Sequence, residues 1–299
     1  MPTMKAAAAK TSSAATARMR FMTRASGMVA GENIPVYDLL MAEVIRAGNK
    51  LVREVRKAMR EGALTESGQC VAEGPRLLED ARRSGRPIRA ALVSEAFAGR
   101  YESRLDGIRT VVLGARDFEA LAGTETTQGI LTLVDPPGVD EERLFGAGTL
   151  LLVLDGVQDP GNAGAMLRAA EAFGAEGAVF LKGTVSPYNA KAVRASAGSI
   201  FRLPVAAGWE AGQFLERASG AGLEIYAAMP RAGLTGERCD FRRGCAIVIG
   251  GEGGGVSERV RAAAKAVTIP VRVVESLNAA VAAAILLYEA NRQREGGVE

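Results

Sequence analysis

Residues 148–291 alternate between short apolar runs and stretches with a helical pattern, and this alternation constrains the fold more than any other feature. Parallel strands must be joined by crossovers, so the pattern predicts a mostly parallel sheet covered by helices on both faces. The expected strands are 150–155, 177–182, 201–205, 223–228, 245–250 and 267–270, and the expected helices are 163–173, 189–198, 210–219, 256–264 and 277–291. The predicted fold class is α/β.

A smaller α/β unit is expected before this region, over residues 46–137. Its predicted helices are 49–60, which carries a positive face, 75–84 and 116–122, and its predicted strands are 69–72, 89–93, 110–113 and 129–134. Prolines and acidic residues then predict a linker at 138–147 before the larger unit at 148–299. Residues 1–45 form a basic extension without a sustained apolar period, which we interpret as disordered.

The amino-acid composition excludes several kinds of chemistry. The chain has no histidine, which removes Ser-His and Cys-His nucleophilic pairs, imidazole acid-base catalysis and most zinc sites. Its three cysteines form no C-x-x-C pair, so neither a disulfide framework nor a cysteine-rich metal cluster is indicated, and we expect no metal. A reduced, cytoplasmic protein without a membrane span is the expectation.

Positive charge is concentrated near the N-terminus. Residues 1–60 hold eleven Lys and Arg against four Asp and Glu, or +7, which leaves −4 for the remainder of a chain whose net charge is +3. This asymmetry favours a polyanionic partner, although a solvated basic tail explains it equally well. An organellar transit peptide is a minor alternative for the first thirty residues.

Polar side chains follow the first strand of the larger unit, at a position where open α/β sheets bind ligands. The strand is expected to end at Asp155, and the turn Asp159-Pro-Gly leads to Asn162, which is a favoured N-cap residue. Arg168 lies further along the helix that follows. It either holds a phosphate or a developing negative charge, or is a surface arginine packed along its stem.

Glycines gather after the strand 245–250, in the run GGEGGG that begins at Gly250. Gly251 and Gly253 match the first two positions of a dinucleotide fingerprint, but Val256 occupies the third and no acidic strand end follows at the required distance. A nucleotide-dependent oxidoreductase is therefore disfavoured. The glycines still allow the backbone to approach a ligand closely, and Glu252 either orients a polar group or is an ordinary exposed acid.

Ser276 and Asn278 stand at the start of an otherwise apolar helix, expected from Ala279 to Tyr288. Both residue types are favoured N-caps, but a helix has one N-cap residue, so capping explains only one of the two. Because this helix is apolar nearly all round, we expect it to be buried in the core or against another subunit.

These three segments resemble the three ordered motifs of the SpoU/TrmH family, which consists of S-adenosylmethionine-dependent RNA 2′-O-ribose methyltransferases in the knotted SPOUT class. The matching positions are Asn162, Gly164, Arg168, Ile249, Gly250, Glu252, Gly255, Ser257, Ile269, Pro270, Ser276, Leu277 and Asn278. Gly251 departs from the pattern, since many relatives have Asn or Ser there. The stretch Val71-Ala-Glu-Gly-Pro-Arg-Leu-Leu makes the smaller unit similar to the L30e-like substrate-binding domain that often precedes the catalytic domain.

The resemblance implies a fold, a cofactor and partners. It implies a C-terminal trefoil knot, S-adenosylmethionine as cofactor, an RNA substrate, and a homodimer in which the second subunit completes each active site. The implied cofactor contacts are with the backbone of Gly250, Gly251, Ile269 and Leu277. The implied polar and catalytic residues are Asn162, Arg168, Glu252, Ser276 and Asn278.

The reaction implied is attack of a ribose 2′-hydroxyl on a sulfonium methyl group, with a base removing the hydroxyl proton. Arg168 is the family's usual candidate for the base, but a guanidinium remains protonated in a protein. We therefore expect Arg168 to bind the phosphate next to the target ribose or to stabilise the developing alkoxide. The expected substrate is ribosomal RNA of the large subunit rather than tRNA, and the alternative is a non-catalytic RNA-binding protein that assists ribosome assembly.

Overall fold

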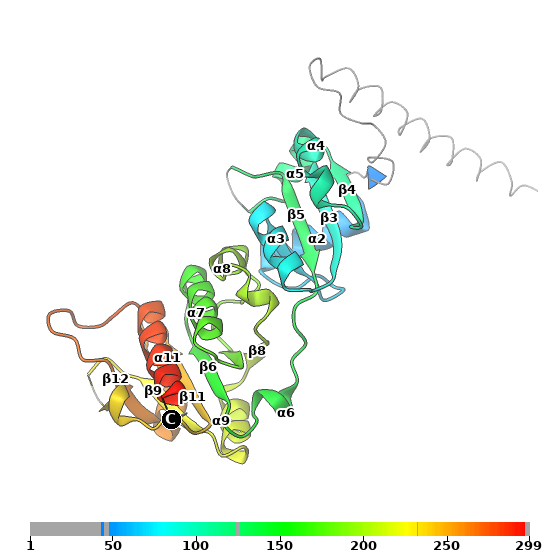
Figure 1. Cartoon of the computed structure of the whole chain (residues 1–299). Coiled ribbons are helices and arrows are strands. Elements are labelled where there is room, and N and C mark those ends of the chain that lie inside the picture. The colour runs from blue at the N-terminus through cyan, green and yellow to red at the C-terminus, as the bar shows by residue number, and fades with distance from the viewer. Residues whose placement is uncertain (1–42, 45–47, 124–125, 232, 297–299) are drawn as a thin grey trace, which may run out of the picture.

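The computed structural model describes residues 43–44, 48–123, 126–231 and 233–296. Figure 1 shows two units, each built around its own sheet and joined by one connection that contains helix α6 (Glu141–Leu144). Most of the basic extension expected at residues 1–45 lies outside the described residues, although Glu43 and Val44 form strand β1. No helix in the described part of the chain has the length and apolar character needed to cross a membrane.

The N-terminal unit contains a five-stranded mixed sheet. Its strands are β1 (Glu43–Val44), β2 (Cys70–Glu73), β3 (Ile88–Ser94), β4 (Thr110–Leu113) and β5 (Ile130–Val134), in the spatial order β1-β4-β3-β5-β2. Strand β3 runs parallel to β4 and antiparallel to β5. The accompanying helices are α2 (Lys50–Glu61), α3 (Pro75–Arg83), α4 (Ala98–Tyr101) and α5 (Ala115–Glu119).

The C-terminal unit contains a seven-stranded sheet in which every pairing is parallel. Its strands are β6 (Leu150–Asp155), β7 (Gly177–Leu181), β8 (Val205–Trp209), β9 (Glu224–Ala228), β10 (Leu234–Thr235), β11 (Cys245–Gly250) and β12 (Lys265–Thr268), in the order β10-β12-β9-β11-β6-β7-β8. The chain moves outward from β6 to β8 and then returns to the other side of β6. The carboxyl ends of β6 and β11 therefore meet where the direction of winding reverses, which is where such sheets bind ligands.

Helices cover both faces of this sheet, as the alternation predicts. One face carries α7 (Pro160–Ala172), α8 (Ala190–Ala195) and α11 (Ala279–Glu295), and the other carries α6, α9 (Ala211–Gly220) and α10 (Glu258–Ala263). Side chains alternate along β6: Leu152 packs on the α7 side, whereas Leu151 and Val153 pack on the α9 side. The strand is thus apolar at every position before Asp155 because both of its faces are buried.

One local prediction was wrong in position. The strand expected at 201–205 begins only at Val205, since residues 199–201 form a 3-10 turn, η4 (Ser199–Phe201). Phe201 at the end of that turn and Leu203 just after it are buried in the core, and Pro204, which has no N–H to donate, directly precedes the strand. The expected linker 138–147 also contains α6, whose Leu144 is buried against the sheet.

The two units are packed against each other rather than merely tethered. Cys70 and Leu77 of the N-terminal unit belong to the same buried apolar cluster as Ile200 of the C-terminal unit. Beside this cluster, Arg194 of α8 donates from Nη1 to Oε2 of Glu73, at 3.0 Å, and the Glu73 side chain is only 4% exposed. The seam therefore combines apolar burial with a nearly buried ion pair that joins β2 to α8.

Candidate active site

Three loops meet at the carboxyl edge of the parallel sheet. Asp155 and Gly250 are register partners at the ends of β6 and β11. The buried Asp155 carboxylate accepts a hydrogen bond from the Ser257 amide at 2.8 Å, and its carbonyl accepts one from the Gly251 amide at 3.0 Å. The loop that follows β11 is therefore held to the end of β6 at two points.

Asn162, Glu252 and Asn278, which lie far apart in the sequence, form one hydrogen-bonded cluster at this edge. The Asn162 side chain donates from Nδ2 to Glu252 Oε1 at 2.6 Å and accepts at Oδ1 from Asn278 Nδ2 at 3.1 Å. Glu252 and Asn278 are exposed, and Asn162 is half-buried. One side chain from each motif thus contributes to a polar surface that is open to solvent. We call these three residues the polar cluster.

The prediction that Asn162 caps helix α7 was wrong. The N-cap is Asp159, whose Oδ1 accepts from the Asn162 amide at 2.8 Å, and Pro160 begins the helix. Lys191 donates to Asp159 Oδ2 at 2.8 Å, and this bond, together with the bond from the Asn162 amide, lowers the pKa of Asp159 below its ordinary value. Because Asp159 supplies the cap, the Asn162 side chain is free to join the polar cluster.

Asn278 performs two tasks with one side chain. Its Oδ1 caps helix α11 by accepting from the amides of Ala280 and Val281, at 2.9 and 3.2 Å, while its Nδ2 reaches Asn162. Asn278 can therefore cap the helix and belong to the polar cluster at the same time. Ser276 lies in the exposed segment before α11 and has no hydrogen bond to the polar cluster within the described part of the chain.

The remaining residues singled out by the third motif lie on the same loop. Ile269 directly follows β12 and packs partly against the core, and Leu277 is half-buried next to the cap. Figure 1 shows the segment between β12 and α11 extending away from the body of the unit before it returns to the helix. Its tip exposes Val273 almost completely.

Arg168 does not join the polar cluster. It lies six residues after Asn162 on α7, which corresponds to about 9 Å along the helix axis and about 240° around it. Its side chain instead lines a groove at the seam between the units, together with Arg76 and Arg83 of α3 and Arg202 after η4. The two polar residues of the first motif therefore lie apart, with Asn162 in the polar cluster and Arg168 in the groove.

Two glycines allow the loops and helices of the site to approach one another closely. A Cβ at Gly164 would lie 2.3 Å from the Ala192 carbonyl oxygen, so this motif glycine permits α7 to pack against α8. A Cβ at Gly251 would lie 2.2 Å from the carbonyl oxygen of Gly156. The departure from the family pattern at Gly251 therefore has a steric reason in this chain.

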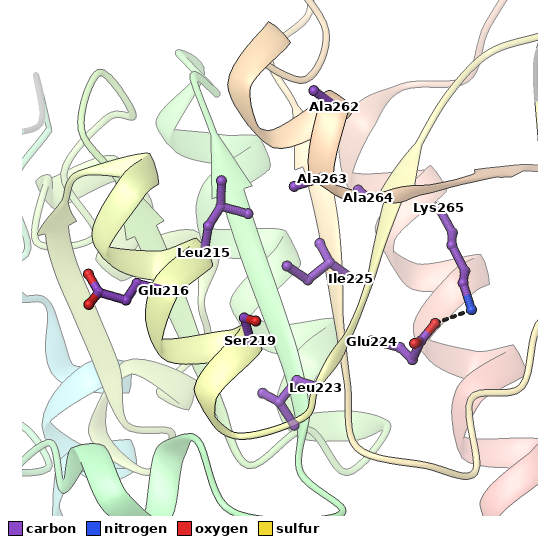
Figure 2. A pocket seen from close by; sticks show the side chains of 10 residues that line it. All are labelled: Leu215, Glu216, Ser219, Leu223, Glu224, Ile225, Ala262, Ala263, Ala264 and Lys265. Atoms are coloured by element: carbon purple, nitrogen blue, oxygen red, sulfur yellow. Dashed lines mark ion pairs between the residues drawn. The ribbon is translucent and has the colours of Figure 1, made fainter.

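A second concavity lies on the opposite face of the sheet (Figure 2). Figure 2 shows residues of α9, β9, α10 and β12 around it, among them Leu215, Ile225 and the ion pair of Lys265 with Glu224. None of the motif residues lines it. The site residues predicted from the sequence therefore lie outside this depression.

The cysteines are unsuited to chemistry at neutral pH. Burial raises the pKa of Cys70 to about 12 and that of Cys245 to about 11, so both thiols remain protonated. Within the residues that the structure describes, no group of three or more Cys, Asp or Glu is arranged to hold a metal ion.

Sequence reasoning did not assign roles to three groups that the structure places at or near the site. Asp155 ties the first two loops together, Asp159 is the cap, and Arg76 and Arg83 face Arg168 across the seam. The Asp-Pro pair at 159–160 is a strong N-cap signal that could have displaced Asn162 from that position. Nothing in local sequence links α3 to α7.

Each unit matches a known protein family. Residues 149–288 match the model of the SpoU rRNA methylase family, and residues 49–132 match that of the MRM3-like substrate binding domain. The 23S rRNA (guanosine(2553)-2'-O)-methyltransferase RlmP of Bacillus subtilis is 32% identical over 251 residues, covering 83% of this chain and 98% of that protein.

Solved structures are also similar to this chain over most of its length. The SpoU methyltransferase AviRb from Streptomyces viridochromogenes, in complex with the cofactor AdoMet, superposes with a TM-score of 0.69 at 27% identity, covering 83% of this chain and 98% of its own. An RNA 2'-O ribose methyltransferase superposes with a TM-score of 0.66 at 28% identity, covering 85% of this chain and all of its own. The chain therefore belongs to the SpoU rRNA methylase family, whose members are S-adenosylmethionine-dependent RNA 2′-O-ribose methyltransferases.

Proposed function

We propose that this protein transfers the methyl group of S-adenosylmethionine to a ribose 2′-hydroxyl of large-subunit ribosomal RNA in the cytoplasm. The observation that carries the proposal is the polar cluster, in which one side chain from each of three separated motifs meets at the strand ends. The similarity to RlmP, which is named for a 23S rRNA target, supports the choice of substrate. The boundaries that we propose are 46–137 for the substrate-binding domain and 148–299 for the catalytic domain.

The loops around the polar cluster suit an adenosyl cofactor. The glycines after Gly251 are exposed, and a Cβ at Gly253 or Gly254 would meet nothing within 4 Å, so this backbone is open to a ligand. We assign cofactor contacts to the backbone of Gly250, Gly251, Ile269 and Leu277. When bound, the cofactor supplies the electrophilic methyl group. We also propose the trefoil knot for this part of the chain.

The side chains then have separate tasks. Glu252 orients the Asn162 amide through a charge-assisted hydrogen bond, and Asn278 holds the other side of that amide, so the cluster is preorganised before a ligand binds. Ser276 is placed to contact the ligand from the loop before α11. Arg168 binds the phosphate beside the target ribose or stabilises the developing alkoxide, while solvent or a neighbouring group removes the proton.

A homodimer would bring Arg168 to a polar cluster that it does not reach within its own chain. Helix α11 exposes Val281, Ile285 and Tyr288 on one side, spaced as neighbours along a helix surface. Such an apolar stripe on a helix that is otherwise packed on the core is typical of a surface covered by another subunit. We propose that α7 and α11 form the dimer interface and that Arg168 serves the partner's active site.

Mixing two inactive variants tests this arrangement. Arg168→Ala and Asn162→Ala proteins are unfolded together, refolded and assayed for methyl transfer to unmodified ribosomal RNA. If Arg168 acts on the partner's site, each mixed dimer contains one intact site, and an equal mixture regains about a quarter of the wild-type activity. Activity no higher than that of either variant alone would contradict the proposal.

Mapping of 2′-O-methyl groups tests the substrate. Cells that lack the protein should lose one modification in large-subunit ribosomal RNA, and the purified protein with S-adenosylmethionine should restore it to a transcript of that RNA. Loss of a modification confined to tRNA would contradict the proposed substrate while leaving the family assignment untouched.

A further inference from the structure

A groove of about 690 Å³ lies at the seam between the two units. Helix α3 lines it with Arg76, Glu79, Asp80 and Arg83. These residues have the spacing i, i+3, i+4 and i+7, which places them on one face of the helix. That face is opposed by Arg168 of α7, so residues nearly a hundred positions apart line the same concavity.

The opposite wall is held in a defined position. Arg202 makes a two-point ion pair with Glu171 of α7, with Nη2 and Oε2 at 2.9 Å, and Glu171 together with the nearby Asp80 raises the pKa of Arg202. Gly198 approaches α3 so closely that a Cβ there would lie 2.6 Å from the Cβ of Asp80. With the Glu73–Arg194 pair beside it, the groove is a packed feature of the seam.

Two acidic residues of the groove, Glu79 and Glu171, have ion-pair partners and Asp80 lies near Arg202, whereas three arginines have no such partner in the described part of the chain. Glu171 is paired with Arg202, and Glu79 lies 3.9 Å from Arg104 outside the groove. Among the residues that the structure describes, Arg76, Arg83 and Arg168 have no carboxylate within ion-pair distance, and all three are exposed. Three guanidinium groups therefore face one concavity without an ion-pair partner, which favours a negatively charged ligand.

The geometry suits an extended polyanion. Arg76 and Arg83 are seven residues apart, or about 10 Å along the axis of α3, and Arg168 approaches from the other unit. Guanidinium groups spread over such a distance match the repeated phosphates of a nucleic-acid strand, and the planar group can bind each phosphate through two hydrogen bonds. Arg168 also belongs to the first family motif, so the groove includes a residue to which we assign a role in the reaction.

We propose that the seam groove binds the sugar–phosphate backbone of the substrate RNA, with Arg76 and Arg83 acting as positioning residues for the strand that leads to the target ribose. The inference rests on the proposed function. It assigns the substrate-binding unit a specific task, which is to hold phosphates in the groove that Arg168 lines from the other side.

The test compares two double variants that each remove two positive charges from exposed helix positions of the N-terminal unit. Arg76→Ala with Arg83→Ala alters the groove, whereas Arg100→Ala with Arg116→Ala alters α4 and α5 outside it. The probe is an unmodified transcript of large-subunit ribosomal RNA. Its binding is measured over a range of salt concentrations, and methyl transfer is measured at saturating RNA.

The groove variant should bind the transcript at least about tenfold more weakly than wild type, and the slope of log affinity against log salt should fall by about 1.5 to 2. Its kcat at saturating RNA and its affinity for S-adenosylmethionine should stay within about twofold of wild type, and Arg76→Lys with Arg83→Lys should recover most of the binding because lysine keeps the charge. The control variant should bind like wild type.

Equal binding and equal salt slopes for the groove variant and the control would overturn the proposal. A fall in kcat at saturating RNA, with binding unchanged, would also overturn it, since that result indicates a role in chemistry or folding rather than in positioning. Failure of the proposed function is distinguishable, because the wild-type protein itself would then transfer no methyl group to the transcript.

Discussion

The two ends of helix α7 differ in what surrounds them, although one sequence motif spans both. At the N-terminal end, Asn162 lies in the polar cluster with Glu252 and Asn278 from the same unit. Further along, Arg168 lies in the seam groove opposite Arg76 of the other unit. The helix therefore presents one motif residue to the strand ends and another to the RNA-binding unit.

This difference teaches that neighbouring motif residues need not act on the same group. Asn162 is held from two sides by hydrogen bonds before any ligand binds, whereas Arg168 has no carboxylate partner in the described part of the chain. A fixed amide suits a site that receives a small cofactor in one orientation, and an unpaired guanidinium suits a phosphate that arrives with the substrate.

The largest effect is expected for Arg168→Lys. Turnover should fall about 10²-fold, because lysine supplies a point charge without the planar fork that binds a phosphate or oxyanion through two hydrogen bonds. The affinity for S-adenosylmethionine, measured by calorimetry, should be unchanged because Arg168 lies outside the polar cluster. Near-normal turnover in single-turnover assays would count against the role of Arg168 as an anion clamp.

A smaller effect is expected for Gly251→Ala, which alters the strand-end site and leaves the groove untouched. The added Cβ would lie 2.2 Å from the Gly156 carbonyl oxygen, so the loops must separate, at a cost of about 1–3 kcal/mol in the free energy of unfolding and with weaker cofactor binding. Gly253→Ala is the matched control, since its Cβ would meet no atom within 4 Å. Denaturant titrations of the two variants should separate them, and indistinguishable midpoints would show that the close approach of the two loops is unimportant.

The smallest effect is expected for Asp159→Asn and concerns acid stability. The Lys191 ammonium and the Asn162 amide lower the pKa of Asp159, so its contribution to stability is present above the ordinary aspartate value of about 3.9 and is lost as the pH falls through the lowered value. Wild type should therefore lose part of its stability below about pH 4, and the variant should show a shallower loss there. Identical profiles for the two proteins between pH 5 and pH 2.5 would disprove the contribution of this carboxylate.

Much of the fold follows from local patterns. Strand β6 begins and ends where expected, at Leu150 and Asp155, because a strand buried on both faces gives a continuous apolar run, which here ends at Leu154. Helix α3 begins at Pro75, whose fixed φ suits a first turn. The strand at Val205 was misplaced because the preceding apolar residues are buried in a turn, and burial alone does not distinguish a turn from a strand.

Some residues of the candidate site could likewise be predicted from the sequence, and others could not. Asn162, Glu252 and Asn278 could be selected from sequence because each is a polar residue at a strand end or a helix start. The cap was misassigned because Asp159 and Asn162 are both favoured capping residues, and only the geometry of the turn decides between them. Arg76 and Arg83 carried no signal, since a helix face with mixed charges is ordinarily a solvated surface.

The sequence by itself determined the α/β class, since strand and helix periodicity act over a few residues, and the resemblance of its three motifs indicated the family. Only the tertiary structure decided that Arg168 lies outside the polar cluster and faces α3 across a packed seam. The physical reason is that helical rotation directs neighbouring motif residues to different sides, and the neighbours found on each side depend on contacts between segments nearly a hundred residues apart.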